Sequence, residues 1–283
     1  MRLDKFLADM GVGSRSDLKK AIRKSLVTVN GAVEKDPGAQ VSAEDHICFD
    51  GEEIRYAEQQ YYMLHKPAGV LSASEDRRQT TVVDLINLND ELVRKDLFPV
   101  GRLDKDTEGL LIITNDGPLA HQLLVPKHHI DKTYYAIVTG TITEDDQRAF
   151  TRGIRYDEKL TALPATLRVL STGKTVADLR HELGFTATSE RLLRTRLAGP
   201  AFIGAEEPAD ITDDTLVSEV EIPIREGKFH QIKKMVKALP GGKEILYLRR
   251  ISMGALRLDP ALAPGEFRKL SESEVRILKD ETN

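Results

Sequence analysis

The chain has 283 residues, of which 40% are hydrophobic and 30% charged, and its formal net charge is −4. This length and apolar content allow a sizeable buried core and predict two domains. The single cysteine, Cys48, excludes an internal disulfide and a cysteine-based zinc site. No run approaches the roughly 18 apolar residues of a membrane span, and no apolar stretch follows the charged first residues, so we expect a cytoplasmic protein.

Positive charge is concentrated in two segments, although the whole chain is acidic. Residues 1–35 carry eight Lys and Arg against four Asp and Glu, and residues 225–250 carry eight against two. Residues 205–221 carry seven acidic side chains and no basic one. Two basic patches on an acidic chain are typical of a protein that binds a polyanion locally while the remainder keeps it dispersed in water.

Residues 1–58 are predicted to form a small domain that begins with two helices and a hairpin. Ser14 and Asp17 make a capping-box-like start for the second helix. Asn30-Gly31 is a dipeptide that favours a two-residue hairpin turn. The second helix is expected to expose a row of basic side chains: Arg15, Lys19, Lys20, Arg23 and Lys24.

Residues 59–283 are predicted to form a mixed-sheet α+β domain, whose first strand follows a polar stretch that ends at residue 60. We expect strands at residues 61–65, 98–100, 132–139, 218–225, 245–248 and 254–258, and helices at 81–88, 118–124, 144–153 and 232–239. Strands and helices alternate without a regular βαβ rhythm, which favours a mixed sheet over a doubly wound one. Residues 172–217 show no clear pattern, and we interpret them as an atypical segment and a candidate insertion.

An acidic loop at residues 101–111, with the sequence GRLDKDTEGLL, has the strongest functional signal in the chain. It places three carboxylates between two glycines and leads directly into an apolar strand. The acids fall at positions 1, 3 and 5 of an EF-hand-like loop, yet Asn115 stands where a calcium loop needs a bidentate Glu. A positioned catalytic carboxylate is therefore a better interpretation than a calcium site.

This loop matches the pseudouridine synthase signature G-R-L-D-x-D-T-x-G-L-L at every fixed position, so the chain resembles that family. The N-terminal helix–helix–hairpin order resembles an S4 RNA-binding domain. Residues 226–235 (EGKFHQIKKM) are similar to an element of the RsuA-type ribosomal RNA branch. Other segments that resemble family motifs are residues 62–71, 132–134 and 248–254. The resemblance covers most of the chain and leaves out roughly residues 172–217.

The resemblance implies an enzyme that isomerises a uridine of ribosomal RNA to pseudouridine. This reaction is redox-neutral and needs no external group, so neither a cofactor nor a metal is expected. By position in the motifs, Asp104 is the catalytic nucleophile, Lys233 the cation that keeps it ionised, and Tyr134 the aromatic side chain that stacks on the flipped uracil. Arg102 is expected to displace or pair with the extruded nucleotide, and Leu248 to line the pocket.

Taken without the resemblance, these residue types also suit structural roles. Lys233 lies one residue off the apolar stripe of its helix, as a solvated lysine would. Tyr134 shares a strand face with Ala136 and Val138, as a core tyrosine would. A salt bridge that orders its own loop suits Arg102, and core packing suits Leu248 equally well.

The S4 resemblance also indicates an RNA-binding face, which we assign to Arg2, Lys5, Arg15, Lys19, Arg23 and Lys24. Residues 2–6 and 126–129 look closest to the enzymes that modify the small subunit, which favours 16S rRNA as the substrate. The alternatives are a large-subunit 23S rRNA pseudouridine synthase and a non-catalytic rRNA-binding ribosome-assembly protein. A carboxylate glycosidase is disfavoured because the chain lacks Trp and has only 5% aromatic residues for sugar platforms. We expect a monomer whose partner is ribosomal RNA, free or in an assembling ribosomal particle, with no membrane contact.

Overall fold

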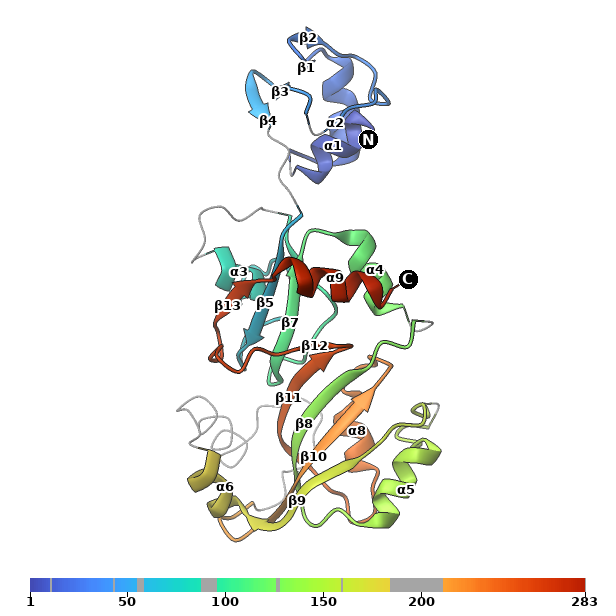
Figure 1. Cartoon of the computed structure of the whole chain (residues 1–283), viewed down its shortest axis with the longest axis vertical. Coiled ribbons are helices and arrows are strands. Elements are labelled where there is room, and N and C mark those ends of the chain that lie inside the picture. Colours follow the sequence, from blue (N-terminus) through green and yellow to red (C-terminus); the bar gives the residue numbers. More distant parts are fainter. Residues whose placement is uncertain are drawn as a thin grey trace.

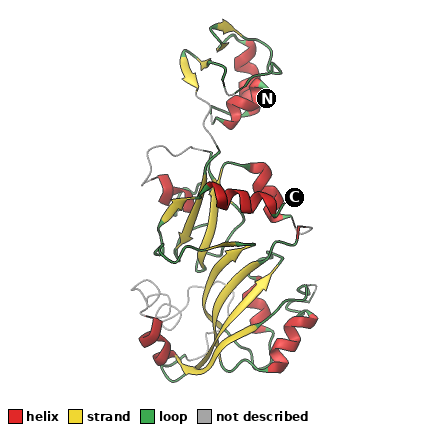
Figure 2. Cartoon of the chain, in the orientation of Figure 1, coloured by secondary structure: helices red, strands yellow, loops and turns green. Residues whose placement is uncertain are grey.

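The structure is a computed structural model that describes residues 1–10, 12–42, 44–54, 59–87, 96–125, 128–158, 160–183 and 211–282. A four-stranded sheet and a nine-stranded sheet organise these residues. The small sheet and its two helices lie at the N-terminal end of the molecule, and the large sheet with its helices makes up the remainder (Figures 1 and 2). None of the described helices has the length and apolar content that a membrane crossing requires.

The N-terminal unit folds as the sequence predicts. It contains α1 (Leu3–Asp9), α2 (Arg15–Arg23), β1 (Val27–Val29), β2 (Ala32–Val33), β3 (Ile47–Phe49) and β4 (Glu52–Ile54). The Ser14 hydroxyl caps α2 by accepting a hydrogen bond from the Asp17 backbone N–H at 3.2 Å. Asn30 and Gly31 both have positive φ, 52° and 82°, as the two central residues of a tight hairpin turn require. Apolar side chains of both helices and of β1 and β3 form one core.

The large sheet is mixed, as expected. Its strands are β5 (Tyr61–Lys66), β6 (Phe98–Pro99), β7 (Glu108–Thr114), β8 (Lys132–Thr139), β9 (Arg168–Thr175), β10 (Leu216–Ile224), β11 (Ile245–Met253), β12 (Leu256–Arg257) and β13 (Phe267–Lys269). Seven of them follow the order β13-β5-β7-β11-β8-β10-β9, with β6 paired to β7 and β12 to β11. The β7–β11 pair is parallel, and the other pairs are antiparallel.

Helices cover both faces of this sheet. They are α3 (Val82–Asn87), α4 (Gly117–Leu124), α5 (Glu144–Arg152), α6 (Val176–Leu183), α8 (Gln231–Lys237) and α9 (Glu272–Asp280). The helices α3, α5 and α8 bury side chains in the same apolar cluster as Tyr134 and Leu248. Side chains of α4 and α9 pack with Met63 on the opposite face, and those of α6 pack with Ile137. Tyr134 and Leu248 therefore point to the face of the sheet that α8 covers, and their neighbours along each strand point to the opposite face.

The sequence patterns missed or shortened several elements. β11 runs to Met253 instead of ending at residue 248, because Arg249 and Arg250 interrupt its apolar pattern. Arg250 is nevertheless buried, and its Nε donates a hydrogen bond to the Leu110 carbonyl at 2.8 Å. β9 is an edge strand without a buried face, so it carries no apolar alternation to detect. Neither β13 nor α9 was expected.

Some expectations fall where the structure does not describe the chain. Residues 55–58, next to the predicted boundary at 58/59, are among them, as are Leu88 of the predicted helix 81–88 and Pro126-Lys127. The boundary therefore stays a prediction. The first part of the predicted atypical segment, residues 172–183, lies in β9 and α6. Residues 184–210 of that segment lie outside the described residues. Its interpretation as an insertion also stays a prediction.

Candidate active site

The acidic loop between β6 and β7 is held from behind by a buried lysine at the end of β5. Lys66 Nζ donates hydrogen bonds to the carbonyls of Pro67, Lys105 and Thr107 at 2.9, 3.2 and 3.0 Å. Burial lowers the pKa of Lys66 to about 8, and the field of nearby acidic side chains opposes this shift only in part. The loop backbone is thus fixed by an ammonium that has no exposed surface.

Further contacts fix both ends of the loop. The Ser72 hydroxyl donates to the Leu103 carbonyl at 2.8 Å and accepts from the Leu103 N–H at 3.0 Å. At the other end, Gly109 has φ +106° and pairs with Arg250 across the parallel β7–β11 ladder. A Cβ at Gly109 would lie 2.2 Å from the Arg250 carbonyl oxygen, so only glycine allows this approach. The motif glycine therefore sets where the loop meets the sheet.

Two carboxylates of this loop share one ammonium. Lys233 Nζ, from α8, lies 3.0 Å from Asp104 Oδ2 and 2.5 Å from Asp106 Oδ1. His230 Nε2 lies 3.8 Å from Asp104 Oδ1. The side chains of Asp104, Asp106 and Lys233 are 26%, 14% and 17% exposed, so the charges are partly removed from water. Lys233 is thus not a solvated helix lysine, and its ammonium is the shared counter-ion of both carboxylates.

One pocket brings together all five residues for which the sequence predicted a role in catalysis or substrate binding. Arg102 and Asp104 come from the acidic loop, Tyr134 from β8, Lys233 from α8 and Leu248 from β11, and all five line it. Tyr134 and Leu248 are 8% and 6% exposed and also belong to the core cluster, so each side chain serves both packing and the pocket wall. Arg102 is exposed and contributes to the same lining.

Sequence reasoning gave no role to three residues that the structure places at this site. Lys66, Asp106 and His230 all lie within the family-like segments, so their motif positions were a usable signal. Their contacts could not be predicted from the motifs, because each contact depends on how distant segments of the chain pack together. His230 also has a left-handed backbone, φ 52° and ψ 30°, which residues other than glycine adopt infrequently.

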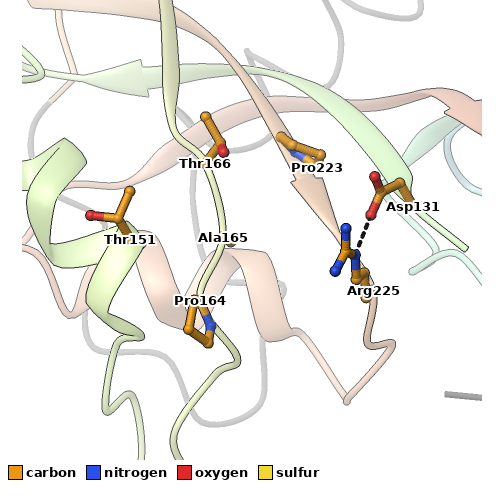
Figure 3. Close-up of a pocket in the computed structure, with 7 residues that line it drawn as sticks. All are labelled: Asp131, Thr151, Pro164, Ala165, Thr166, Pro223 and Arg225. Atoms are coloured by element: carbon orange, nitrogen blue, oxygen red, sulfur yellow. Dashed lines mark hydrogen bonds and ion pairs between the residues drawn. The ribbon is translucent and has the colours of Figure 1, made fainter. Parts of the chain in front are cut away.

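A second, larger cavity of about 240 Å³ lies away from these carboxylates (Figure 3). It is lined by Asp131, Thr151, Pro164, Ala165, Thr166, Pro223 and Arg225. Arg225 Nε donates to Asp131 Oδ1 at 2.9 Å, and this ion pair neutralises the charged side chains of the lining. Within the described ranges, no group of three or more His, Cys, Asp or Glu is placed to hold a metal ion. Of the two pockets, the pocket of Asp104 is therefore the candidate active site.

The six residues predicted to bind RNA divide into two groups. The first surrounds the fully buried carboxylate of Asp4, at 3.1 Å for Arg2, 3.3 Å for Arg15 and 3.9 Å for Lys19. A hydrogen bond from Arg2 holds the pKa of Asp4 below its ordinary value. The second group is exposed and has no ion-pair partner within the described part of the chain; it consists of Lys5, Arg23 and Lys24.

Comparison with known proteins supports the family suggested by this site. The RNA pseudouridylate synthase family matches residues 60–238, and the S4 domain family matches residues 1–47. The chain belongs to the RNA pseudouridylate synthase family. It is a pseudouridine synthase of α+β fold with an N-terminal S4 domain, and the resemblance to the RsuA-type enzymes is confirmed by the relatives described next.

Three curated relatives and one solved structure extend along nearly the whole chain. The uncharacterized RNA pseudouridine synthase YtzG of Bacillus subtilis is 39% identical over 281 residues, 99% of each chain. Ribosomal small subunit pseudouridine synthase A of Pasteurella multocida is 34% identical, covering 97% of this chain and 98% of its own. Ribosomal large subunit pseudouridine synthase B of Bacillus subtilis is 33% identical, covering 98% and 95%. A crystal structure of a pseudouridylate synthase is 32% identical, with a TM-score of 0.58 and coverage of 98% and 99%.

Proposed function

We propose that this enzyme converts a specific uridine of small-subunit 16S ribosomal RNA to pseudouridine. The observation that carries the proposal is the pairing of Asp104 with Lys233 in a pocket that Tyr134 and Leu248 also line. Relatives named for the small ribosomal subunit support the choice of substrate. A relative named for the large subunit makes 23S rRNA the second candidate.

The pocket residues supply the parts that this isomerisation needs. The N1–C1′ bond of the uridine breaks, a C5–C1′ bond forms, and a proton moves from C5 to N1, so no atom is gained or lost. Asp104 acts as the anionic nucleophile and is regenerated, while Lys233 keeps it ionised and Asp106 shares that ammonium. Tyr134 stacks on the detached uracil, and Leu248 provides the apolar wall.

The target nucleotide must leave its stack to reach Asp104, which costs a few kcal/mol. In this proposal the exposed side chain of Arg102 displaces the extruded nucleotide or pairs with it. Phosphate contacts from the N-terminal basic face and from residues 225–250 offset the cost. The enzyme acts as a monomer on rRNA, free or in an assembling particle, and a ribosomal substrate agrees with the expected cytoplasmic location.

A direct test incubates the purified full-length protein with separate 16S and 23S rRNA transcripts and maps the pseudouridines formed. The proposal predicts one modified position in the 16S transcript and none when Asp104→Asn is used. Modification of the 23S transcript alone would establish the second candidate instead. Absence of pseudouridine in both transcripts and in small-subunit particles, with RNA binding retained, would favour the non-catalytic assembly protein.

A further inference from the structure

An exposed aromatic ring lies beside the active pocket, and the proposed reaction does not use it. Phe229 is 68% exposed, more than any other large hydrophobic residue in the described part of the chain. Its neighbours Lys228 and His230 both line the pocket that contains Asp104. A single exposed apolar side chain is common on protein surfaces, so exposure alone assigns no role. The surroundings of this ring are more informative.

The Phe229 ring is stacked on the imidazole of the next residue. The ring centroids of Phe229 and His230 are 3.7 Å apart, and the rings are inclined by 21°. His230 has a left-handed backbone, which is unfavourable for a residue other than glycine, at the point where the two consecutive rings lie face to face. Since His230 Nε2 is 3.8 Å from Asp104, the two rings form a continuous surface from the catalytic carboxylate out to solvent.

A cationic side chain lies against this aromatic pair. Lys234 Nζ lies 5.6 Å from the Phe229 ring centroid, within the range of a cation–π contact. Lys234 also lies 3.8 Å from Asp157, and Lys228, the residue before Phe229, lies 2.7 Å from Glu226. Flat rings next to ammonium groups are the combination with which proteins bind unpaired nucleotides, since bases stack and phosphates pair with cations.

We propose that Phe229 and His230 form a stacking platform for the base of a nucleotide adjacent to the target uridine. The proposal rests on the proposed function only in taking the ligand to be substrate RNA. When the target is extruded into the pocket, the neighbouring base loses a stacking partner, and the exposed Phe229 ring replaces it at the pocket mouth. Because every base has a π face, the platform contributes affinity and holds the strand in place without selecting a sequence.

The test measures RNA affinity of the full-length protein in an Asp104→Asn background, which prevents conversion during the titration. The probes are a fluorescent single-stranded uridine oligomer and an abasic oligomer of the same length. We expect Phe229→Ala to weaken binding of the uridine oligomer about tenfold and Phe229→Tyr to change it less than about twofold. Leu170→Ala, at a 49% exposed side chain on edge strand β9, is the matched control and should leave the affinity unchanged.

On the abasic oligomer, Phe229→Ala and its parent should bind equally, and the slope of log Kd against log salt should be the same for both. Equal losses on the two oligomers, or equal losses for Phe229→Ala and Leu170→Ala, would overturn the platform. So would an unchanged affinity of Phe229→Ala while the native enzyme still modifies rRNA. A base-dependent loss in a protein that modifies no rRNA transcript would support the platform and contradict the proposed function.

Discussion

The active pocket and the basic N-terminal face both depend on charged side chains but hold them in different environments. The side chains of Asp104, Asp106 and Lys233 are between 14% and 26% exposed, and they pair with one another. On the N-terminal face, Arg23 and Lys24 point into water. Pairing is strong where water is partly excluded, whereas surface charges are screened by salt. One substitution in the pocket should therefore change the rate steeply, while each substitution on the face should change affinity by a small, additive amount.

The largest effect is expected from Asp104→Asn, which keeps the shape of the side chain and removes the carboxylate that we propose as the nucleophile. Isomerisation should fall to background in a single-turnover assay, while RNA affinity stays within about twofold of the native value. Asp106→Asn is the matched control, since it removes the other carboxylate at Lys233, and it should slow the reaction by about tenfold without abolishing it. An inactive Asp106→Asn together with an active Asp104→Asn would reverse the assignment.

The next largest effect is expected from Lys233→Met. Loss of the ammonium removes the positive charge that lies 3.0 Å from Asp104 Oδ2 and 2.5 Å from Asp106 Oδ1, so the two carboxylates lose their shared counter-ion and Asp104 is no longer held in place. The rate near neutral pH should fall by about a hundredfold. Exposed Lys237, one turn along α8, provides the control Lys237→Met. Equal single-turnover rates for the two variants would remove Lys233 from the mechanism.

A third prediction concerns stability and the buried ammonium of Lys66. Its pKa is lowered from 10.5 to about 8 by burial, so between these two values the unfolded chain binds more protons than the folded one. The unfolding free energy of the native protein relative to Lys66→Met should therefore rise with pH across this window, by up to about 3 kcal/mol. Urea unfolding at pH 7.5 and pH 10 measures it, with Lys105→Met, at an exposed lysine, as the control for a general loss of basic charge. A difference that does not change with pH would show that burial does not lower the pKa of Lys66.

The smallest effects should come from substitutions on the N-terminal face. Two pairs of basic residues there should differ, because only one pair contacts the buried carboxylate of Asp4. Arg23→Met with Lys24→Met should lower the slope of log K against log salt by about 0.7–0.9 for each phosphate that the variant no longer neutralises, without a change in stability. Arg15→Met with Lys19→Met should in addition lower the unfolding free energy by about 1–2 kcal/mol, because Asp4 then keeps only Arg2. Equal stabilities of the two double variants would mean that the Asp4 ion pairs are immaterial.

The sequence predicted correctly those elements that depend on a pattern of nearby residues. The strand β8 follows from clean alternation, and the cap of α2 follows from Ser14 and Asp17, three residues apart. The motifs indicated which residues belong to the site, since Arg102, Asp104, Tyr134, Lys233 and Leu248 line one pocket. Their roles in the reaction remain predictions, because geometry shows proximity and the variants above test chemistry.

What the sequence could not show are contacts between distant residues and elements without a buried face. Lys233 and Asp106 are 127 residues apart, so nothing local indicates that one ammonium serves two carboxylates. No local pattern marks Lys66 as a buried residue, and only the folded loop shows that its ammonium donates to three carbonyls. The predicted strand ends at residue 248, whereas β11 continues through the buried Arg250. A charged residue inside a central strand is recognisable only once its hydrogen-bond partner is known.

The claim that the pocket performs the chemistry while the N-terminal face holds the RNA is tested most directly by single-turnover kinetics at increasing enzyme concentration. The limiting rate constant reports on the pocket, and the enzyme concentration at half-maximal rate reports on binding. We expect Lys233→Met to lower the limiting rate constant and leave the half-maximal concentration unchanged. The Arg23→Met, Lys24→Met double variant should raise the half-maximal concentration and leave the limiting rate constant unchanged. A lower limiting rate constant in that double variant, or a raised half-maximal concentration as the sole change in Lys233→Met, would contradict the account.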